Sequence, residues 1–200
     1  MRGQHWYLYL IMDIYSRKII AWEVHDAESG ELAKHLLERA LLREGCWHQP
    51  PVLHSDNGAP MTSYTLKARL TELGMLMSYS RPRVSNDNPY SEALFRTVKY
   101  CPAWPAKGFA SLSAVRDWML TFERAYNEQH LHSGLRYVTP ADRHQGVDRE
   151  RLEHRKAVYE SAKRRHPQRW SGKTRNWEVP GSVSLNPGKL QEVERNKQAA

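Results

Sequence analysis

The feature that most restricts the fold of this 200-residue chain is a pair of strand-length apolar runs near the N-terminus. Residues 5–12 and 18–25 are rich in aromatic and aliphatic side chains, which favour strands. The five residues between them, 13–17, include Asp13 and Ser16, both of which are common in turns. Because so short a connection joins neighbouring antiparallel strands, the sequence predicts a β-hairpin.

Helical and strand-length segments alternate after this hairpin. Ser29 can cap a helix in which leucine and alanine recur at helical spacing, and Gly45 ends that segment. We expect, in order, a strand at 51–55, a helix at 62–73, a strand at 75–80, and helices beginning near Pro89 and spanning 111–128 and 147–165. This mixed order predicts an α/β fold layered around a sheet.

The chain is strongly basic, with a formal net charge of +8 at pH 7. Such an excess favours a polyanionic partner, most commonly nucleic acid, although a soluble basic protein without one is the alternative. No apolar run reaches the ~20 residues that span a bilayer, and no signal peptide is evident, so we expect a cytoplasmic protein with no membrane partner. Cys46 and Cys101 lack zinc-finger spacing and are expected to be free thiols.

Two carboxylates occupy positions where chemistry is common. Asp56 follows an apolar strand and precedes Asn57 and Gly58, and Glu92 begins a helix. Each has an ordinary explanation, since aspartate forms turns and an acidic residue suits a helix N-terminus. The 35 residues between them hold a helix, a strand and a loop, enough chain to return Glu92 beside Asp56.

Converging carboxylates are typical of Mg²⁺ chemistry on phosphodiesters, because hard cations prefer oxygen ligands. In a two-metal site the ions lie roughly 3.5–4 Å apart, one activating the attacking oxygen and the other stabilising the leaving oxygen. Two carboxylates support such a site only in part, and a third is normally required.

Several blocks of sequence resemble the integrase core (DDE) domain of IS-three-type insertion-sequence transposases, in the retroviral integrase superfamily. The resemblance is carried, in order, by residues 7–22, 54–58, 85–99, 126–141 and 165–187. It implies an RNase H-like mixed sheet flanked by helices, with a small C-terminal appendage. Asp56 matches the second catalytic aspartate of the family and Glu92 its catalytic glutamate, and both would be metal ligands.

The resemblance also implies an activity and partners. Such enzymes use Mg²⁺ or Mn²⁺ to cleave a DNA strand at an element end and to join its 3′-hydroxyl to target DNA. They need no covalent enzyme–DNA intermediate. DNA is thus the expected partner, and the complete protein is expected to form a homo-oligomer in a bacterial cytoplasm. The N-terminal helix-turn-helix region that binds element ends in the family has no counterpart in this sequence.

The sequence departs from the family at its N-terminus. The first catalytic aspartate of the family precedes the hairpin, on the first and central strand, but residues 1–12 contain no acidic residue. Asp13 matches a turn residue of the hairpin, so we assign it a structural role. We therefore expect the first strand to be missing, and the isolated chain to lack strand-transfer activity and to be poorly stable.

Basic residues flank Glu92 in the sequence. Arg81, Arg83, Arg96 and Lys99 are candidates for contacts with DNA phosphates, with ordinary surface solubility as the alternative for each. Asn57, Gly58 and Asn88 are candidates for support of the catalytic loops. The helix at 147–165 mixes both signs of charge, so a solvated helix and a DNA-binding surface are both open.

These observations predict a truncated integrase catalytic core at 1–145, followed by a basic helix and a tail containing Trp, Pro and Gly at 146–200. The tail is expected to be β-rich or irregular. Three functions are weighed: a DDE transposase core, a non-catalytic basic remnant that binds DNA or a transposase subunit, and an RNase H-type nuclease. The block at 126–141 argues against the nuclease.

Overall fold

The computed structural model describes residues 5–82, 84 and 87–185. The chain divides into two compact units, which are described separately. The first comprises Met1–Met12, Ile20–Met119 and Ser184–Ala200, and the second comprises Asp13–Ile19 and Leu120–Val183. Arg83, one of the candidate phosphate contacts, lies outside the described residues. The domain boundary proposed between residues 145 and 146 stays a prediction.

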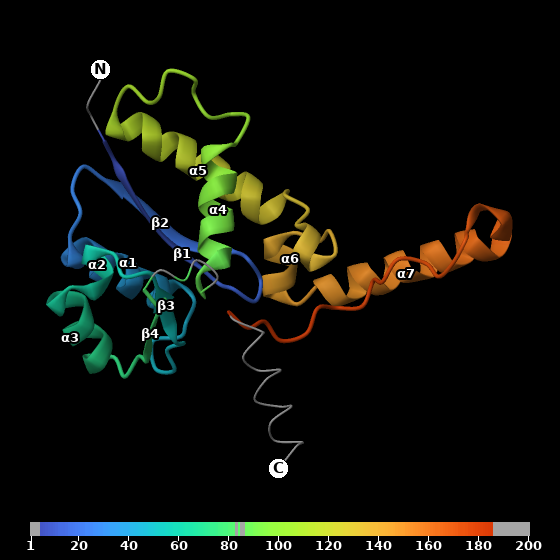
Figure 1. The fold of residues 1–200 in the computed structure, drawn as a ribbon, viewed down its shortest axis with the longest axis horizontal. Coiled ribbons are helices and arrows are strands. Elements are labelled where there is room, and N and C mark those ends of the chain that lie inside the picture. The colour runs from blue at the N-terminus through green and yellow to red at the C-terminus, as the bar shows by residue number, and fades with distance from the viewer. Residues whose placement is uncertain (1–4, 83, 85–86, 186–200) are drawn as a thin grey trace, which may run out of the picture. The chain divides into compact units, whose positions relative to one another are not determined.

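The predicted hairpin is present, and it forms one of two small sheets. Strand β1 (Tyr7–Met12) pairs with β2 (Ile19–His25) (Figure 1). Strand β3 (Leu53–Ser55) pairs with β4 (Met77–Tyr79) in parallel. Among the described residues, no strand joins these pairs into the single mixed sheet that the sequence suggested. Within the described part of the chain, β1 and β3 each pair along one edge.

The core of the first unit forms around helix α1 (Gly30–Arg43). As predicted, Ser29 caps this helix, its Oγ accepting a hydrogen bond from the Leu32 N–H at 3.2 Å. The buried face of α1 consists of Ala33, Leu36, Leu37, Ala40 and Leu41. These side chains pack in one cluster with residues of β1, β2 and the helix that precedes β4. Their spacing therefore places α1 against the strands.

The helix expected at 62–73 is present as α3 (Tyr64–Glu72), and a short helix that the sequence analysis did not identify, α2 (Ala59–Thr62), precedes it. Ser63 separates the two helices, because its extended backbone ends α2 while its Oγ accepts from the Leu66 N–H and caps α3. A side chain at Gly30 would place its Cβ 2.0 Å from Ser63 Oγ. The start of α1 thus packs directly on this cap, and the contact requires glycine.

The two following helices agree with the sequence analysis. Helix α4 (Pro89–Lys99) begins with proline and buries Leu94 and Val98. Helix α5 (Leu112–Glu128) extends from the first unit into the second. A connection between them carries Trp104 and Phe109, whose rings meet that of Trp118 edge-on at 5.2 and 5.7 Å.

The second unit contains a helix that the sequence analysis did not identify. After the 3₁₀ turn Ser133–Leu135 comes α6 (Pro140–Gln145), where Thr139 and Asp142 form a capping box. Helix α7 (Asp148–Arg165) and a 3₁₀ turn at Pro167–Arg169 follow. None of the helices in the described part of the chain is long and apolar enough to cross a membrane.

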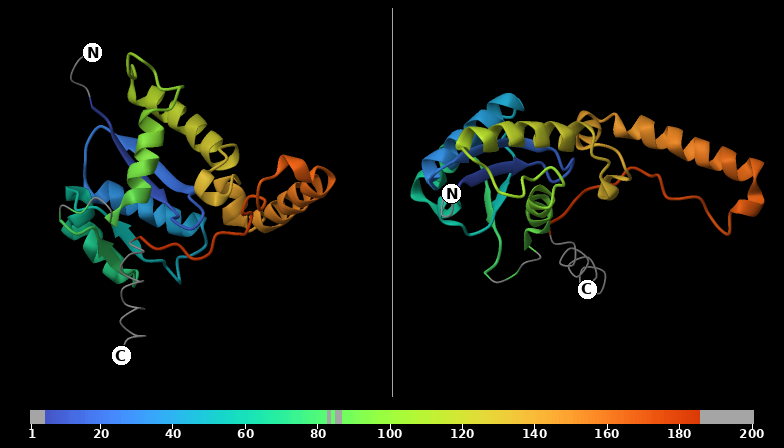
Figure 2. Two further views of the ribbon diagram at one scale, coloured as in Figure 1. Left: turned by 45° about the vertical axis from the view of Figure 1, so that its right-hand side comes forward. Right: turned by 90° about the horizontal axis from the view of Figure 1, so that it is seen from above.

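The segment after α7 returns along that helix without forming a strand among residues 170–185 (Figure 2). Trp177 is buried in a small core with Leu135, Val138 and Leu152. Of the two forms expected for the tail, the irregular one is therefore observed over its described part. The aromatic side chain of Trp177 fixes the segment to the unit.

Candidate active site

Asp56 stands where β3 ends, in a turn that its own side chain stabilises. Its Oδ1 accepts a hydrogen bond from the Gly58 N–H at 3.0 Å. A Cβ at Gly58 would come within 3.1 Å of that same oxygen, so the turn favours glycine. This arrangement is an Asx-turn, as residues 56–58 suggest, and it leaves the side chain of Asp56 exposed.

The turn after β3 is also tied to the end of β4. Asn57 Nδ2 donates to the Ser80 carbonyl at 2.8 Å, and the Ser80 N–H donates to the Ser55 carbonyl at 3.0 Å. His54 Nδ1 lies 3.0 Å from Ser78 Oγ across the same strand pair. The two parallel strands thus end together, and the side chain of Asn57 links their ends; its support of a catalytic loop stays a prediction.

Glu92 lies in the first turn of α4, with an exposed side chain. The first turn of a helix favours an acidic group, and the Glu92 N–H donates to the carbonyl of Asn88 at 3.3 Å. Asn88 occupies the position before the helix, although its side chain makes no capping hydrogen bond. Pro89 then begins the helix, one residue after Asn88.

Asp56 and Glu92 line the same pocket, which has a volume of about 690 Å³. The other lining residues are Asn57, Ser80, Arg81, Pro82, Val84, Asn88, Ser91 and Phe95. Thus five of the residues singled out in the sequence, from two segments more than 20 residues apart, meet at one hollow of the first unit. Ser91 and Phe95 were not singled out; both lie on α4 near Glu92.

The loop between β4 and α4 is held by an ion pair. The guanidinium of Arg81 donates twice to the buried carboxylate of Asp87, at 2.8 and 2.9 Å, and the Arg81 N–H donates to it as well. This pairing raises the pKa of Arg81 above its usual value, through the hydrogen bond with Asp87 first and its charge second. Arg81 therefore fixes the loop; its contact with DNA stays a prediction.

Arg96 and Lys99 are exposed on the last turns of α4. Both cations lie over the ring of Tyr100, at 5.8 and 5.9 Å from its centroid. Tyr100 is itself 70% exposed. The pair presents positive charge and an aromatic face on the helix that carries Glu92, which suits contacts with phosphates.

The donor set suits a hard divalent cation only in part. Asp56 and Glu92 offer exposed carboxylate oxygens, the ligands that Mg²⁺ and Mn²⁺ prefer. The described residues lining the pocket include no third acidic side chain. Across the described part of the chain, no cluster of three or more His, Cys, Asp or Glu is placed to hold a metal ion. Of the three carboxylates that such a site would need, the two predicted from the sequence line one pocket.

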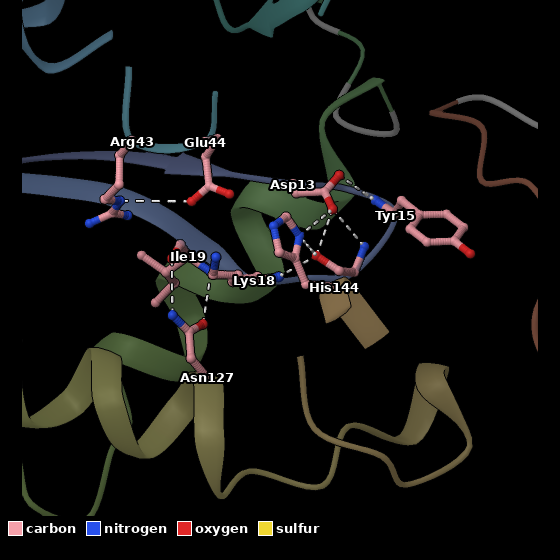
Figure 3. Close-up of polar contacts among 9 residues, drawn as sticks. Asp13, Tyr15, Lys18, Ile19, Arg43, Glu44, Asn127 and His144 are labelled. Atoms are coloured by element: carbon pink, nitrogen blue, oxygen red, sulfur yellow. Dashed lines mark hydrogen bonds and ion pairs between the residues drawn. The ribbon is translucent and has the colours of Figure 1, made fainter. Parts of the chain in front are cut away.

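Asp13 belongs to a separate network in the second unit, shown in Figure 3. Its carboxylate accepts from the Tyr15 and Ser16 N–H groups, each at 3.1 Å, and from Ser16 Oγ at 2.6 Å. His144 Nδ1 lies 3.4 Å from the same carboxylate. Burial raises the pKa of Asp13, but these hydrogen bonds outweigh it, and the pKa falls below its usual value. Asp13 has the turn-forming role predicted for it.

The serine of this network has no exposed hydroxyl, although Asp, His and Ser stand together. Ser16 is fully buried, and its Oγ donates to Asp13. A serine nucleophile would instead donate to a histidine base and face substrate. The three side chains therefore hold the turn against α6. The contact of His144 with this turn was not predictable from local sequence patterns, because His144 lies 128 residues from Ser16.

A second buried contact holds the start of β2. Asn127 of α5 accepts from the Ile19 N–H at 2.9 Å and donates to the Ile19 carbonyl at 3.0 Å (Figure 3). Its Nδ2 also donates to Glu123 at 2.6 Å. In the sequence, Asn127 stands out only as part of the block at 126–141. Its structural role is to satisfy both backbone groups of a buried residue.

Models of two integrase core domain families match the chain, one over residues 1–85 and the other over residues 73–140. The transposase for insertion sequence element IS904 of Lactococcus lactis is 29% identical over 138 residues. That match covers 68% of this chain and 53% of the relative. The chain belongs to the integrase core family. The assignment made from the sequence blocks is thereby confirmed.

Other relatives of this integrase core are also insertion-sequence transposases. The putative transposase InsK for IS150 of Escherichia coli is 25% identical, covering 71% of this chain and 50% of the relative. The chain thus spans about half the length of these curated relatives. Among solved structures, a chain of the simian T-cell lymphotropic virus intasome, in complex with PP2A regulatory subunit B56 gamma, superimposes with a TM-score of 0.53 at 14% identity. That superposition covers 72% of this chain and 49% of the other, and it supports the RNase H-like fold.

Proposed function

We propose that this integrase core acts in DNA transposition, with Asp56 and Glu92 as two of the ligands for catalytic divalent metal. The observation that carries the proposal is their common pocket, in a chain that belongs to the integrase core family. The insertion-sequence transposases among its relatives give the reaction class. The substrates would be the element ends and the target DNA.

When bound, Mg²⁺ or Mn²⁺ would supply charge stabilisation to a phosphodiester and lower the pKa of a coordinated water or hydroxyl. The residues of the chain would position the reactants. Asp56 is held by its own turn, and Glu92 by the first turn of α4. The Arg81–Asp87 ion pair would keep the loop between them in place, while Arg96 and Lys99 would contact phosphates.

Binding of Mn²⁺ provides a direct test of the carboxylate pair. We expect paramagnetic broadening of amide signals near residues 56–58 and 91–93 in NMR spectra of the chain. Asp56→Asn and Glu92→Gln should each weaken binding by more than 10-fold, since even outer-shell changes cost about 10–100-fold in metal affinity. Asp26→Asn is the matched control, because it removes one exposed carboxylate that does not line the pocket.

Unchanged Mn²⁺ affinity in both variants would refute the metal assignment. Metal binding with no DNA cleavage would support the incomplete core expected from the sequence, since a third carboxylate is not among the described lining residues. Robust Mg²⁺-dependent cleavage of element ends by this chain alone would contradict that expectation. The homo-oligomer and the binding of element ends stay proposals.

A further inference from the structure

The second unit contains a basic hollow of about 520 Å³ between α7 and the segment that returns along it. We name it the α7 groove. Its charged lining residues are Lys156, Glu160 and Lys163 from the helix and Lys173, Arg175 and Glu178 from the returning segment. Four cations and two carboxylates give the lining a net charge of +2. Two separate segments thus bring positive charge to one place.

The cations of the α7 groove differ in how firmly they are held. Lys163 Nζ donates to the carbonyl of Gly172 at 2.6 Å, which ties the returning segment to α7. Arg175 stacks over Tyr137, with its guanidinium carbon 4.7 Å from the ring centroid. Lys156 and Lys173 are exposed and have no acidic partner among the described residues. Fixed and free cations together suit a ligand with several negative oxygens.

Trp177 adds an independent sign of a ligand. Its side chain lines the groove and is 6% exposed, yet its indole Nε1 has no hydrogen-bond acceptor among the described residues. Buried tryptophan N–H groups usually find an acceptor. An anionic oxygen in the groove would supply one after a small shift of the segment.

The aromatic residues beside the groove form its scaffold. The ring of Tyr159 meets that of Trp170 at 5.9 Å and that of Trp177 at 5.1 Å, both edge-on. Among the described residues that line the groove, the aromatic one is Trp177, which is 6% exposed and leaves little ring face for stacking with nucleic-acid bases. Recognition by the groove would therefore rest on charge and hydrogen bonds to phosphate, which carry no base sequence.

We propose that the α7 groove binds backbone phosphates of DNA, as a second site distinct from the pocket of Asp56 and Glu92. The choice of DNA as the source of phosphate rests on the proposed function. The groove would contribute affinity without sequence preference. A solvated mixed-charge helix is the competing explanation, but it accounts neither for cations supplied by the returning segment nor for the unpaired indole.

Salt dependence of DNA binding distinguishes the two explanations. Each phosphate neutralised contributes about −0.9 to the slope of log K against log salt. The variant Lys156→Gln/Lys173→Gln should therefore make the slope measured with a random-sequence duplex less negative by about 1.8. At low salt its affinity for the duplex should fall by roughly 10- to 100-fold. Arg149→Gln/Arg164→Gln removes the same charge from exposed positions of α7 outside the groove and should leave the slope nearly unchanged.

A probe without DNA separates this inference from the proposed function. In NMR spectra of the intact chain, titration with tripolyphosphate should shift the indole N–H signal of Trp177. The variant Trp177→Phe, which lacks this signal, assigns it. Equal salt slopes for the groove and control variants would overturn the proposal. An indole shift without any change of slope would also overturn it, because the groove would then bind free polyphosphate instead of DNA. Failure of the metal assignment would appear separately, in Mn²⁺ binding at Asp56 and Glu92.

Discussion

Asn127→Ala should destabilise the second unit more than any change at the surface of α5. The Asn127 side chain is 4% exposed and satisfies both backbone groups of Ile19, which is fully buried. Removing it leaves a buried N–H and a buried carbonyl without partners. Each such group costs about 1–3 kcal/mol, so we expect a loss of roughly 2–6 kcal/mol in the free energy of unfolding.

Asn127→Asp gives a graded version of the same test. Aspartate can still accept from the Ile19 N–H, but it cannot donate to the Ile19 carbonyl or to Glu123. It also places two carboxylates one helical turn apart, because Glu123 precedes it by four residues. The loss should therefore again be large, even though the shape of the side chain is kept.

Urea unfolding, followed by circular dichroism and by tryptophan fluorescence, measures both variants. Glu128→Ala is the control on the same helix, since Glu128 is exposed and its 3.9 Å contact with Arg124 is worth at most about 0.5 kcal/mol. If Asn127→Ala shifts the midpoint no more than this control does, the buried amide contact is not stabilising and the argument is wrong.

Two further changes test other parts of the second unit. The pKa of His132 is lowered to about 4, first by burial and second by the charges of Arg17 and His130. Because the unfolded chain then binds a proton more readily than the folded one, the free energy of unfolding should fall as the pH drops from 6.5 towards 4. His132→Asn can keep the hydrogen bond from the Gly134 N–H and should remove about 1–2 kcal/mol of that loss, a value reduced for the partial exposure of the ring. Urea midpoints of the unchanged chain and of the variant that depend on pH in the same way would contradict this. Arg143→Met should lower the free energy of unfolding by about 3–5 kcal/mol, because it leaves Asp148 buried and unpaired. The double variant Arg143→Met/Asp148→Leu should recover most of this loss. A double variant less stable than the single one would contradict the argument.

Local patterns predicted most of the elements. The cap at Ser29, the start of a helix at Pro89 and the hairpin of the two apolar runs were all predicted. Capping, backbone restriction and strand propensity act within a few residues, so a local stretch of sequence is enough to show them. The missed elements were short. Helix α6 has only six residues and α2 only four, too few for a periodic pattern.

The candidate site was predictable in its carboxylates and less so in its surroundings. Asp56 and Glu92 were found because turn and helix signals place them at the ends of elements, and the resemblance supplied their pairing. The ion pair of Arg81 with Asp87 was missed because the two residues lie six positions apart in a loop, and loop geometry has no periodicity to show which charges meet. Contacts such as Ser16 with His144 were beyond local patterns altogether.

The residues of the family's sequence blocks divide into two physical kinds. Asp13, Ser16 and Asn127 are engaged with polar partners inside the second unit, and their hydrogen bonds are used up in holding the turn and the start of β2. Asp56 and Glu92 are exposed instead, and only Oδ1 of Asp56 is engaged by its own turn. A metal ligand must keep free oxygens, whereas a scaffold residue must not. Acidic residues of the same motif therefore have opposite requirements, and their hydrogen bonds distinguish them. The carboxylate oxygens of Asp13 are engaged by its partners, which excludes it as a metal ligand. Asp56 and Glu92 keep oxygens exposed and so qualify as ligands.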